Sequence, residues 1–128
     1  DAAVPDAERV VLCTGKVYYD IEAERRRRNI EGVAIIRLEQ LYPFPAQELS
    51  TLIGRYPVAA ELAWAQEEPR NMGAWRFVRE RFLDGDVPAA GNRHLHYVGR
   101  RPSASPAPGS HKTHLEEQDA IVREALES

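Results

Sequence analysis

A group of polar and charged residues, Gln66-Glu67-Glu68, follows an apolar stretch near the middle of the chain. Two neighbouring carboxylates are groups that general acid/base catalysis uses. Adjacent residues on an extended strand point to opposite faces, so Glu67 and Glu68 cannot easily act on one substrate. The carboxyl end of a strand is still where open α/β sheets place ligands and contacts. The sequence therefore predicts a polar corner here, and it gives no local support for a Ser-His-Asp or Cys-His catalytic set.

A second candidate site lies at Thr14-Gly15-Lys16, where the first predicted strand meets the first predicted helix. Free amides and the positive end of the helix dipole make such a junction a natural site for an anion, and Lys16 adds a positive charge. The full phosphate-loop motif needs a glycine where this chain has Val10. Taken alone, the incomplete motif favours a tight turn over an anion site.

Two arginines, Arg100 and Arg101, directly follow the last predicted strand, so they too lie at the carboxyl end of a strand. If the strands are neighbours in one sheet, these arginines and Lys16 form one positive pocket. The alternative is a structural role, in which the arginines pair with Glu67 or Glu68. The sequence leaves both interpretations open.

The other charged clusters have simpler interpretations. The run from Arg25 to Arg28 crowds the last turn of a predicted helix, where positive charge suits the helix dipole. We therefore interpret it as a solvated helix end. Zinc needs three or four ligands, and nothing in the sequence unites the pair His94 and His96 with the pair His111 and His114. No metal site is expected.

Length and composition are those of one globular domain. The chain has 128 residues, 43% of them hydrophobic and 29% charged, and its net charge of −3 gives no electrostatic case for nucleic acid binding. No apolar run approaches the roughly 20 residues of a membrane span, and the small, acidic first residues lead us to expect no secretory leader. The single cysteine, Cys13, cannot form an internal disulfide, which fits a reducing compartment.

Strand and helix patterns alternate four times along the chain. Apolar runs predict strands at 9–15, 33–38, 62–65 and 95–98, the third ending before Pro69. Helical spacing predicts helices at 16–29, 45–56, 72–82 and from about Thr113 to Leu126, with Asn71 as the N-cap of the third. Connections of this kind are right-handed crossovers, so we expect an α/β, Rossmann-like, three-layer αβα sandwich with a mostly parallel sheet. We interpret residues 1–8 as a linker from a preceding domain and residues 9–128 as the domain itself.

Long blocks of the chain resemble a known family. The resemblance runs from about Arg9 to Leu126 and is to the C-terminal domain of the 2-oxoglutarate dehydrogenase E1 component. The blocks that carry it occur in the family's order, and they are 11–20 (VLCTGKVYYD), 33–45 (VAIIRLEQLYPFP), 66–75 (QEEPRNMGAW) and 99–106 (GRRPSASP).

The resemblance implies a transketolase-like C-terminal domain within a longer enzyme. Such an enzyme decarboxylates 2-oxoglutarate on thiamine diphosphate with magnesium, and then transfers the succinyl group to the lipoyl arm of the E2 component. In this family the thiamine and metal residues lie in earlier domains, and none of those motifs is present here. We therefore expect no catalytic, cofactor-binding or metal-binding residue in this chain, which alone is expected to be inactive.

The resemblance also implies partners. The domain is expected to contact the rest of the E1 chain and to help build the E1 homodimer, within a complex containing the E2 succinyltransferase. Some members bind acetyl-CoA or AMP as an effector at this domain. Combining position with that role, we predict effector contacts at Lys16, Gln66, Arg100 and Arg101.

Several alternatives stay open at this stage. Related 2-oxoadipate dehydrogenases and acyltransferase-fused 2-oxoglutarate decarboxylases share the architecture. Two further alternatives are that the domain is a non-catalytic nucleotide-binding module, or that it has a purely structural role in dimer contacts. The expected compartment is the bacterial cytoplasm, or the mitochondrial matrix for a eukaryotic parent.

Overall fold

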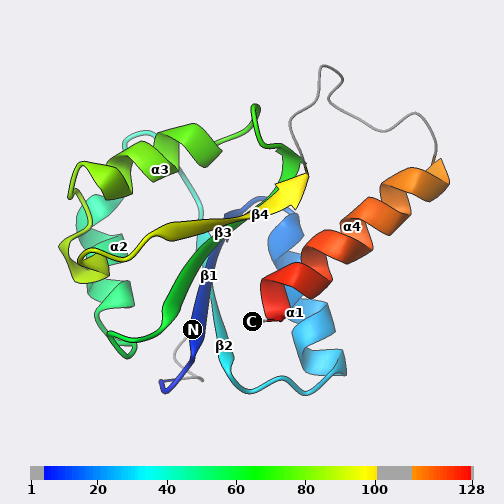
Figure 1. Ribbon diagram of the computed structural model, residues 1–128, viewed down its shortest axis with the longest axis horizontal. Coiled ribbons are helices and arrows are strands. Elements are labelled where there is room, and N and C mark those ends of the chain that lie inside the picture. The colour runs from blue at the N-terminus through cyan, green and yellow to red at the C-terminus, as the bar shows by residue number, and fades with distance from the viewer. Residues whose placement is uncertain (1–4, 101–110, 128) are drawn as a thin grey trace.

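A parallel sheet between two layers of helices forms the centre of the molecule. The computed structural model describes residues 5–100 and 111–127. The strands have the order β2-β1-β3-β4, and all three neighbouring pairs are parallel, which confirms the predicted three-layer α/β fold (Figure 1). The strands are β1 (Arg9–Thr14), β2 (Val33–Leu38), β3 (Glu61–Pro69) and β4 (Leu95–Arg100). The helices are α1 (Val17–Arg27), α2 (Ala46–Ile53), α3 (Trp75–Leu83) and α4 (His111–Leu126), with a 3₁₀ turn η1 (Pro88–Ala90).

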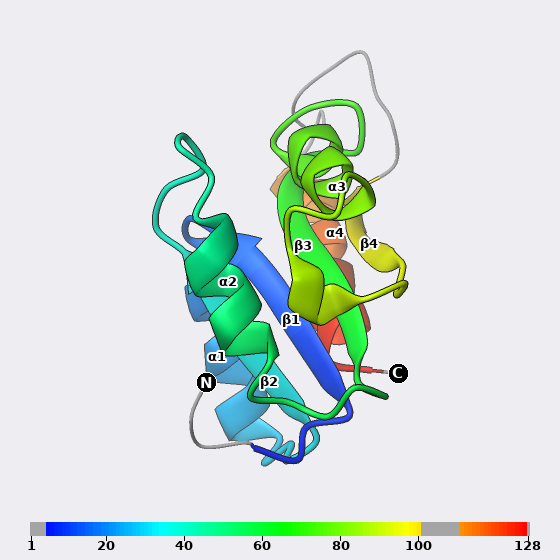
Figure 2. The same ribbon diagram turned by 90° about the vertical axis from the view of Figure 1, so that its left-hand side faces the viewer.

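Alternate side chains of each strand enter two separate cores. In β1, Val10 and Leu12 pack on the face covered by α2 and α3, whereas Val11 and Cys13 pack on the face covered by α1 and α4. Figure 2 shows α2 and α3 in front of the sheet. Burying one such aliphatic side chain contributes about 1.5–3 kcal/mol. Because β1 is covered on both faces, its residues from Arg9 to Cys13 are all buried, whereas β4, at the edge of the sheet, buries only Val98.

Two expected element boundaries were wrong. β3 continues through Pro69, because the ladder is irregular between Ala65 and Pro69 and the N–H of Arg70 then donates to the carbonyl of Arg100, at 3.1 Å. α3 begins at Trp75 rather than after Asn71. Gly73, with φ of +67°, lies in the left-handed region, so a right-handed helix cannot begin before it.

The start of the domain lies against its core. Ala7 is buried, and the N–H of Glu8 donates to the carbonyl of Gly32 at 2.8 Å. The division into a linker at 1–8 and a domain at 9–128 stays a prediction. In the described ranges, no helix is both long and apolar enough to cross a membrane.

Arg9, at the start of β1, connects the first strand to the last helix. Its Nη1 donates to the carbonyls of Glu124 and Ala125, at 2.7 and 3.1 Å. These carbonyls belong to the last turn of α4, where the helix dipole favours a positive charge. The Arg9 residue is only 8% exposed. The guanidinium therefore caps a helix that lies more than a hundred residues away in sequence.

We predict that Arg9→Met lowers the free energy of unfolding by about 1–3 kcal/mol, because two buried carbonyls lose their charged donor. Urea unfolding followed by circular dichroism measures the change. Arg76→Met is the matched control, since Arg76 is exposed and has no ion pair in the described part of the chain. Equal stability of the two variants would contradict the capping role of Arg9.

Candidate functional site at the carboxyl edge of the sheet

The side-chain amide of Gln66 lies at the junction of β3 and α3, and it is almost fully buried, with 2% of the residue exposed. Its Oε1 accepts hydrogen bonds from Trp64 Nε1 at 2.9 Å and from the N–H of Trp75 at 3.0 Å. Its Nε2 donates to the carbonyls of Glu68, Pro69 and Met72 at 3.1, 3.0 and 2.9 Å. Gln66 thus bonds the N-terminus of α3, the role that the sequence assigned to Asn71.

An aromatic cluster packs beside this amide. The rings of Trp75 and Tyr97 have centroids 5.2 Å apart, and the Arg70 guanidinium lies over both, 5.7 and 5.2 Å from their centroids. The Tyr97 hydroxyl donates to the carbonyl of Arg100. Burial raises the pKa of Tyr97 to about 12. A Cβ at position 99 would lie 2.5 Å from the Tyr97 hydroxyl, so Gly99 is the residue that fits here.

A charged cluster lies on the other side of β3, around Glu67. Lys16 Nζ is 3.7 Å from Glu67 Oε1, and an Nη1 of Arg100 donates to the backbone carbonyl of Glu67. The Lys16 side chain is 77% exposed, so this ion pair is screened by water and contributes little to stability. The structure therefore brings Lys16 and Arg100 together at one residue, because β1, β3 and β4 end at the same edge of the sheet.

Helix α4 supplies two further members of this cluster. Glu117 Oε2 accepts from Arg100 Nε at 2.8 Å. Gln118 Nε2 donates to Glu67 Oε1 at 2.8 Å and to Asp20 Oδ2 at 3.0 Å. The sequence analysis missed both residues, since their only local signal is a polar position on a helix. The parallel topology brings them to the carboxyl edge.

An open groove of about 670 Å³ runs between α1 and α4 beside Lys16. Its positive and negative side chains are equal in number, so the groove has no net charge at its walls. The lining residues are Lys16, Asp20, Ala23, Glu24, Arg27, Leu115, Gln118, Asp119, Val122 and Arg123.

The structure describes three of the four predicted effector residues and places them on two sides of the sheet. Lys16 and Arg100 lie together on the side of the sheet covered by α1 and α4. Gln66 lies on the side of α2 and α3, with its amide bonded within the protein. Arg101 lies outside the described residues. Glu67 and Glu68 do point away from each other, since Glu68 is next to Gly73 and Glu67 is next to Lys16.

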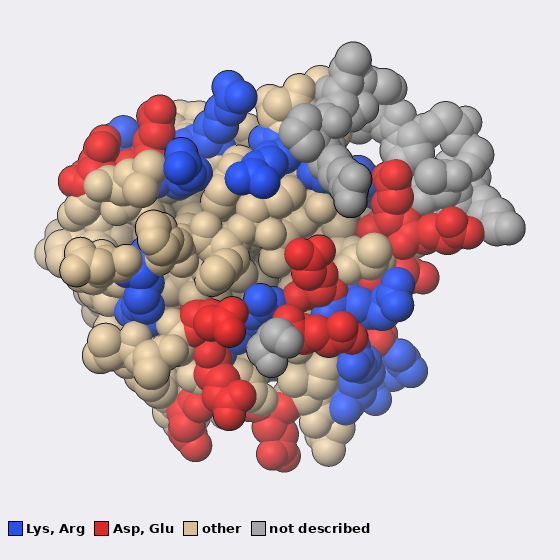
Figure 3. Space-filling view, viewed as in Figure 1, with Lys and Arg blue, Asp and Glu red and all other residues tan. Residues whose placement is uncertain are grey.

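The surface charge is unevenly distributed. Figure 3 shows Lys and Arg over α3 and beside the tip of β4, and again at the lower right over α1 and α4, with Asp and Glu between and around them. Within the described ranges, no group of three His, Cys, Asp or Glu residues could hold a metal ion. At this edge Lys16 and Arg100 are both bonded to groups of the protein, Lys16 to the Glu67 carboxylate and Arg100 to the Glu117 carboxylate.

Comparisons with known proteins agree with the resemblance seen in the sequence. The family described as 2-oxoglutarate dehydrogenase C-terminal matches residues 2–126. A 2-oxoglutarate dehydrogenase E1 component from Rickettsia felis is 47% identical over 118 residues, which is 92% of this chain and 12% of the relative. One from Cupriavidus necator is 41% identical over 134 residues, 98% of this chain and 14% of the relative. One from Brucella anthropi is 46% identical over 120 residues, 92% of this chain and 12% of the relative.

We predict that Gln66→Leu destabilises the chain by about 3 kcal/mol or more, because the Trp64 indole N–H and the Trp75 amide lose their buried acceptor. Thermal or urea unfolding measures the loss. Gln40→Leu makes the same chemical change at an exposed position and should alter stability by less than about 0.5 kcal/mol. A Gln66→Leu variant as stable as Gln40→Leu would show that the amide does not hold the corner.

Proposed function

The chain belongs to the 2-oxoglutarate dehydrogenase C-terminal family, and from this premise we propose that it serves as the C-terminal domain of a 2-oxoglutarate dehydrogenase E1 component. The observation that carries the proposal is the family match, which covers residues 2–126 of the 128. Relatives of that name are 41–47% identical over more than nine tenths of the chain. The chain spans about an eighth of their length.

The activity that we propose for the longer protein is the oxidative decarboxylation of 2-oxoglutarate and transfer of the succinyl group to the lipoyl group of E2. Thiamine diphosphate and magnesium would supply the decarboxylation chemistry in that enzyme. The described residues do not fit a site for them, because no carboxylate or histidine cluster here could hold the metal. We therefore derive no step of the reaction from this chain and assign it no catalytic residue.

The contribution that we propose for this domain is assembly of the E1 homodimer. The tightly bonded corner at Gln66 and the buried faces of the sheet make the domain rigid, which suits a role in positioning other domains. The relatives' names support 2-oxoglutarate over 2-oxoadipate as the substrate of the longer enzyme. We propose the bacterial cytoplasm as the compartment, because the single cysteine, Cys13, is free and a reducing compartment keeps cysteines in that state.

A second candidate function is effector binding by the same domain. The specific observation that favours it is the convergence of Lys16 and Arg100 at the carboxyl edge, beside a groove large enough for a nucleotide. A phosphate near Lys16 would also lie at the N-terminus of α1. Acetyl-CoA and AMP are the proposed ligands. Gln66 and Arg101 remain predicted contacts, although the Gln66 amide is already bonded within the protein.

The assembly role predicts the behaviour of a chimera. We expect that this chain, replacing the matched segment of the Rickettsia felis relative, gives an enzyme that releases CO₂ from 2-oxoglutarate with thiamine diphosphate and magnesium. Deletion of the segment should abolish turnover, and the chain alone should give none. Ferricyanide reduction measures the first half-reaction. A deletion variant as active as the chimera would remove this domain from the function of the enzyme.

The effector role predicts a change in affinity. Titration calorimetry with AMP and acetyl-CoA should show binding that Lys16→Ala weakens by about tenfold, the effect of losing one charge-assisted contact. Arg55→Ala is the control, because Arg55 is exposed after α2 at the opposite end of the sheet. Equal binding by the two variants would remove Lys16 from the site.

A further inference from the structure

Helix α3 presents arginine side chains to solvent on its outer face. Arg76 and Arg79 lie about one turn apart, both are exposed, and neither forms an ion pair within the described part of the chain. Neither lysine of the chain belongs to α3, so the positive groups over this helix in Figure 3 are arginines. A positive surface therefore lies on a chain whose net charge is −3.

A third arginine lies in the turn that leads into α3. Arg70 is exposed, and its guanidinium is held 5.7 Å from the centroid of the Trp75 ring and 5.2 Å from that of the Tyr97 ring. Glu68, the exposed carboxylate closest to it in sequence, forms no ion pair among the described residues. A guanidinium stacked on rings keeps its N–H donors at the edge of its plane, where they reach a carboxylate. Arg70 is thus oriented without being neutralised.

The negative side chains of this region gather at the far end of the helix. Arg81 Nη2 lies 3.1 Å from Asp84 Oδ2, and its Nη1 lies 3.1 Å from Asp86 Oδ2, so this arginine is neutralised where α3 ends. Glu80 is the one carboxylate within α3, and it too forms no ion pair in the part of the chain that the structure describes. The positive part of the surface is therefore the beginning of α3 and the turn before it.

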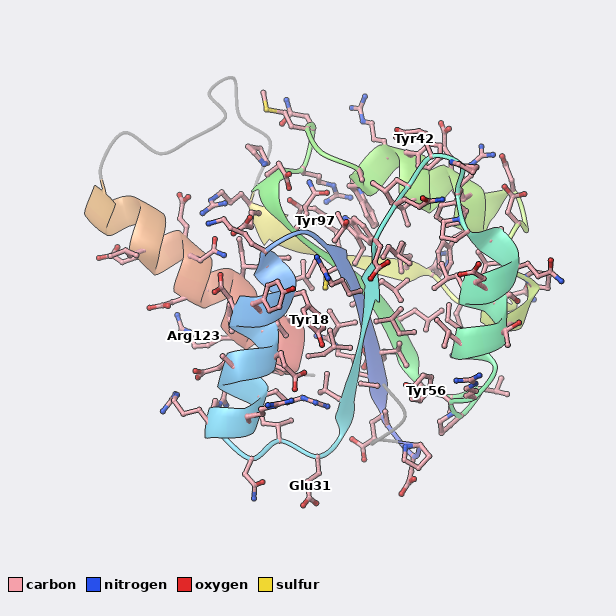
Figure 4. The ribbon with its side chains drawn as sticks, turned by 180° about the vertical axis from the view of Figure 1, so that it is seen from behind. Tyr18, Glu31, Tyr42, Tyr56, Tyr97 and Arg123 are labelled. Carbon is pink, nitrogen blue, oxygen red and sulfur yellow. The ribbon has the colours of Figure 1, made fainter. Side chains whose placement is uncertain are left out.

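An exposed tyrosine borders this surface. Tyr42 is 71% exposed, and its ring packs on Phe77 of α3 with centroids 4.5 Å apart. In Figure 4, Tyr42 lies beside α3, on the opposite side of the molecule from Arg123 of α4. Arginine and tyrosine are among the side chains enriched at protein interfaces, whereas lysine is depleted there. We call the set Arg70, Arg76, Arg79 and Tyr42 the α3 arginine face.

We propose that the α3 arginine face binds an acidic surface of a separate protein, whose carboxylates pair with the three arginines. The inference goes beyond the proposed assembly role and does not depend on it. Three guanidiniums without an ionic partner among the described residues offer paired N–H donors, the geometry that a carboxylate accepts. Tyr42 adds apolar contact area at the border of the face. Attraction between opposite charges also speeds the encounter, which suits a partner that binds and leaves.

Charge disfavours two other occupants of this face. In a twofold contact between two copies of the chain the same residues meet, so arginines would face arginines. Nucleic acid is bound along a continuous positive track. Here Glu80 and the carboxylates at the end of α3 interrupt such a track. An acidic protein surface needs only the short positive part at the beginning of the helix.

Fluorescence anisotropy of a fluorescein-labelled, glutamate-rich peptide at low ionic strength tests the proposal. The chain should bind this peptide, and added salt should weaken the binding, because the attraction is between exposed charges. The double variant Arg76→Glu/Arg79→Glu replaces two donors by carboxylates and should weaken binding by tenfold or more.

A complementary variant and a control separate the face from folding and from net charge. Glu80→Gln removes the one carboxylate of α3 and should tighten peptide binding about twofold, a gain that a damaged fold cannot produce. Arg55→Glu/Arg123→Glu changes net charge as the first double variant does, at two exposed arginines away from α3 that form no ion pair in the described ranges. This control should bind within about threefold of the original. Circular dichroism should show unchanged unfolding for every variant, since the replaced side chains are exposed.

Other results of these measurements overturn the inference. Absence of peptide binding at low salt would reject it, because attraction between opposite charges needs no particular sequence. Equal weakening by the two double variants would reduce the effect to net charge. Tighter binding of a single-stranded oligothymidylate of the same charge, or of phosphatidylserine vesicles, with loss in Arg76→Glu/Arg79→Glu, would assign the face to nucleic acid or to a membrane instead.

The chimera with the Rickettsia felis relative separates an external partner from another domain of the longer enzyme. The proposal requires that the chimera binds the peptide as the chain does, with the same loss in Arg76→Glu/Arg79→Glu. A chimera that does not bind the peptide, while the chain does, would show that another domain covers α3 and would reject a separate protein as the occupant.

Discussion

The buried amide of Gln66 is the interaction on which the carboxyl edge of this domain depends. A primary amide offers two donor hydrogens and two acceptor positions, and this one uses them on an indole, a helix N-terminus and three carbonyls. These partners belong to β3, to the turn after it and to α3, which are otherwise connected by an irregular stretch of chain. Removing the amide itself would take the acceptor from the Trp64 indole N–H and from the Trp75 N–H at once, so the corner depends on this one side chain.

The strand alternation divides this corner into two sides with different properties. Gln66 faces the α2 and α3 side, where its bonds are buried and permanent. Glu67 faces the α1 and α4 side, where its contacts with Lys16 and Gln118 are partly exposed to solvent. One residue step along β3 thus separates a buried hydrogen-bond network from a partly exposed charged one.

The sequence predicted the layers of the fold well because apolar runs and helical spacing act locally. The sequence prediction failed at Pro69 and Asn71, the expected end of β3 and the expected N-cap of α3. The amide of Gln66, not Asn71, accepts from the N–H of Trp75, and the left-handed Gly73 delays the start of the helix. It left open whether Lys16 and Arg100 meet, and the structure brings both to Glu67 although β3 lies between β1 and β4. It could not find Gln118, since a polar residue on a helix gives no sign of which sheet edge it reaches. The effector roles of Lys16, Gln66, Arg100 and Arg101 remain predictions.

The capping of α4 by Arg9 has a consequence for how the protein is made. The carbonyls that Arg9 binds belong to Glu124 and Ala125, so β1 lacks this partner until nearly the whole domain has left the ribosome. One face of β1 also stays uncovered until the apolar side chains of α4 pack against it. Helix α4 is therefore the element that completes the cover and the hydrogen bonds of the first strand.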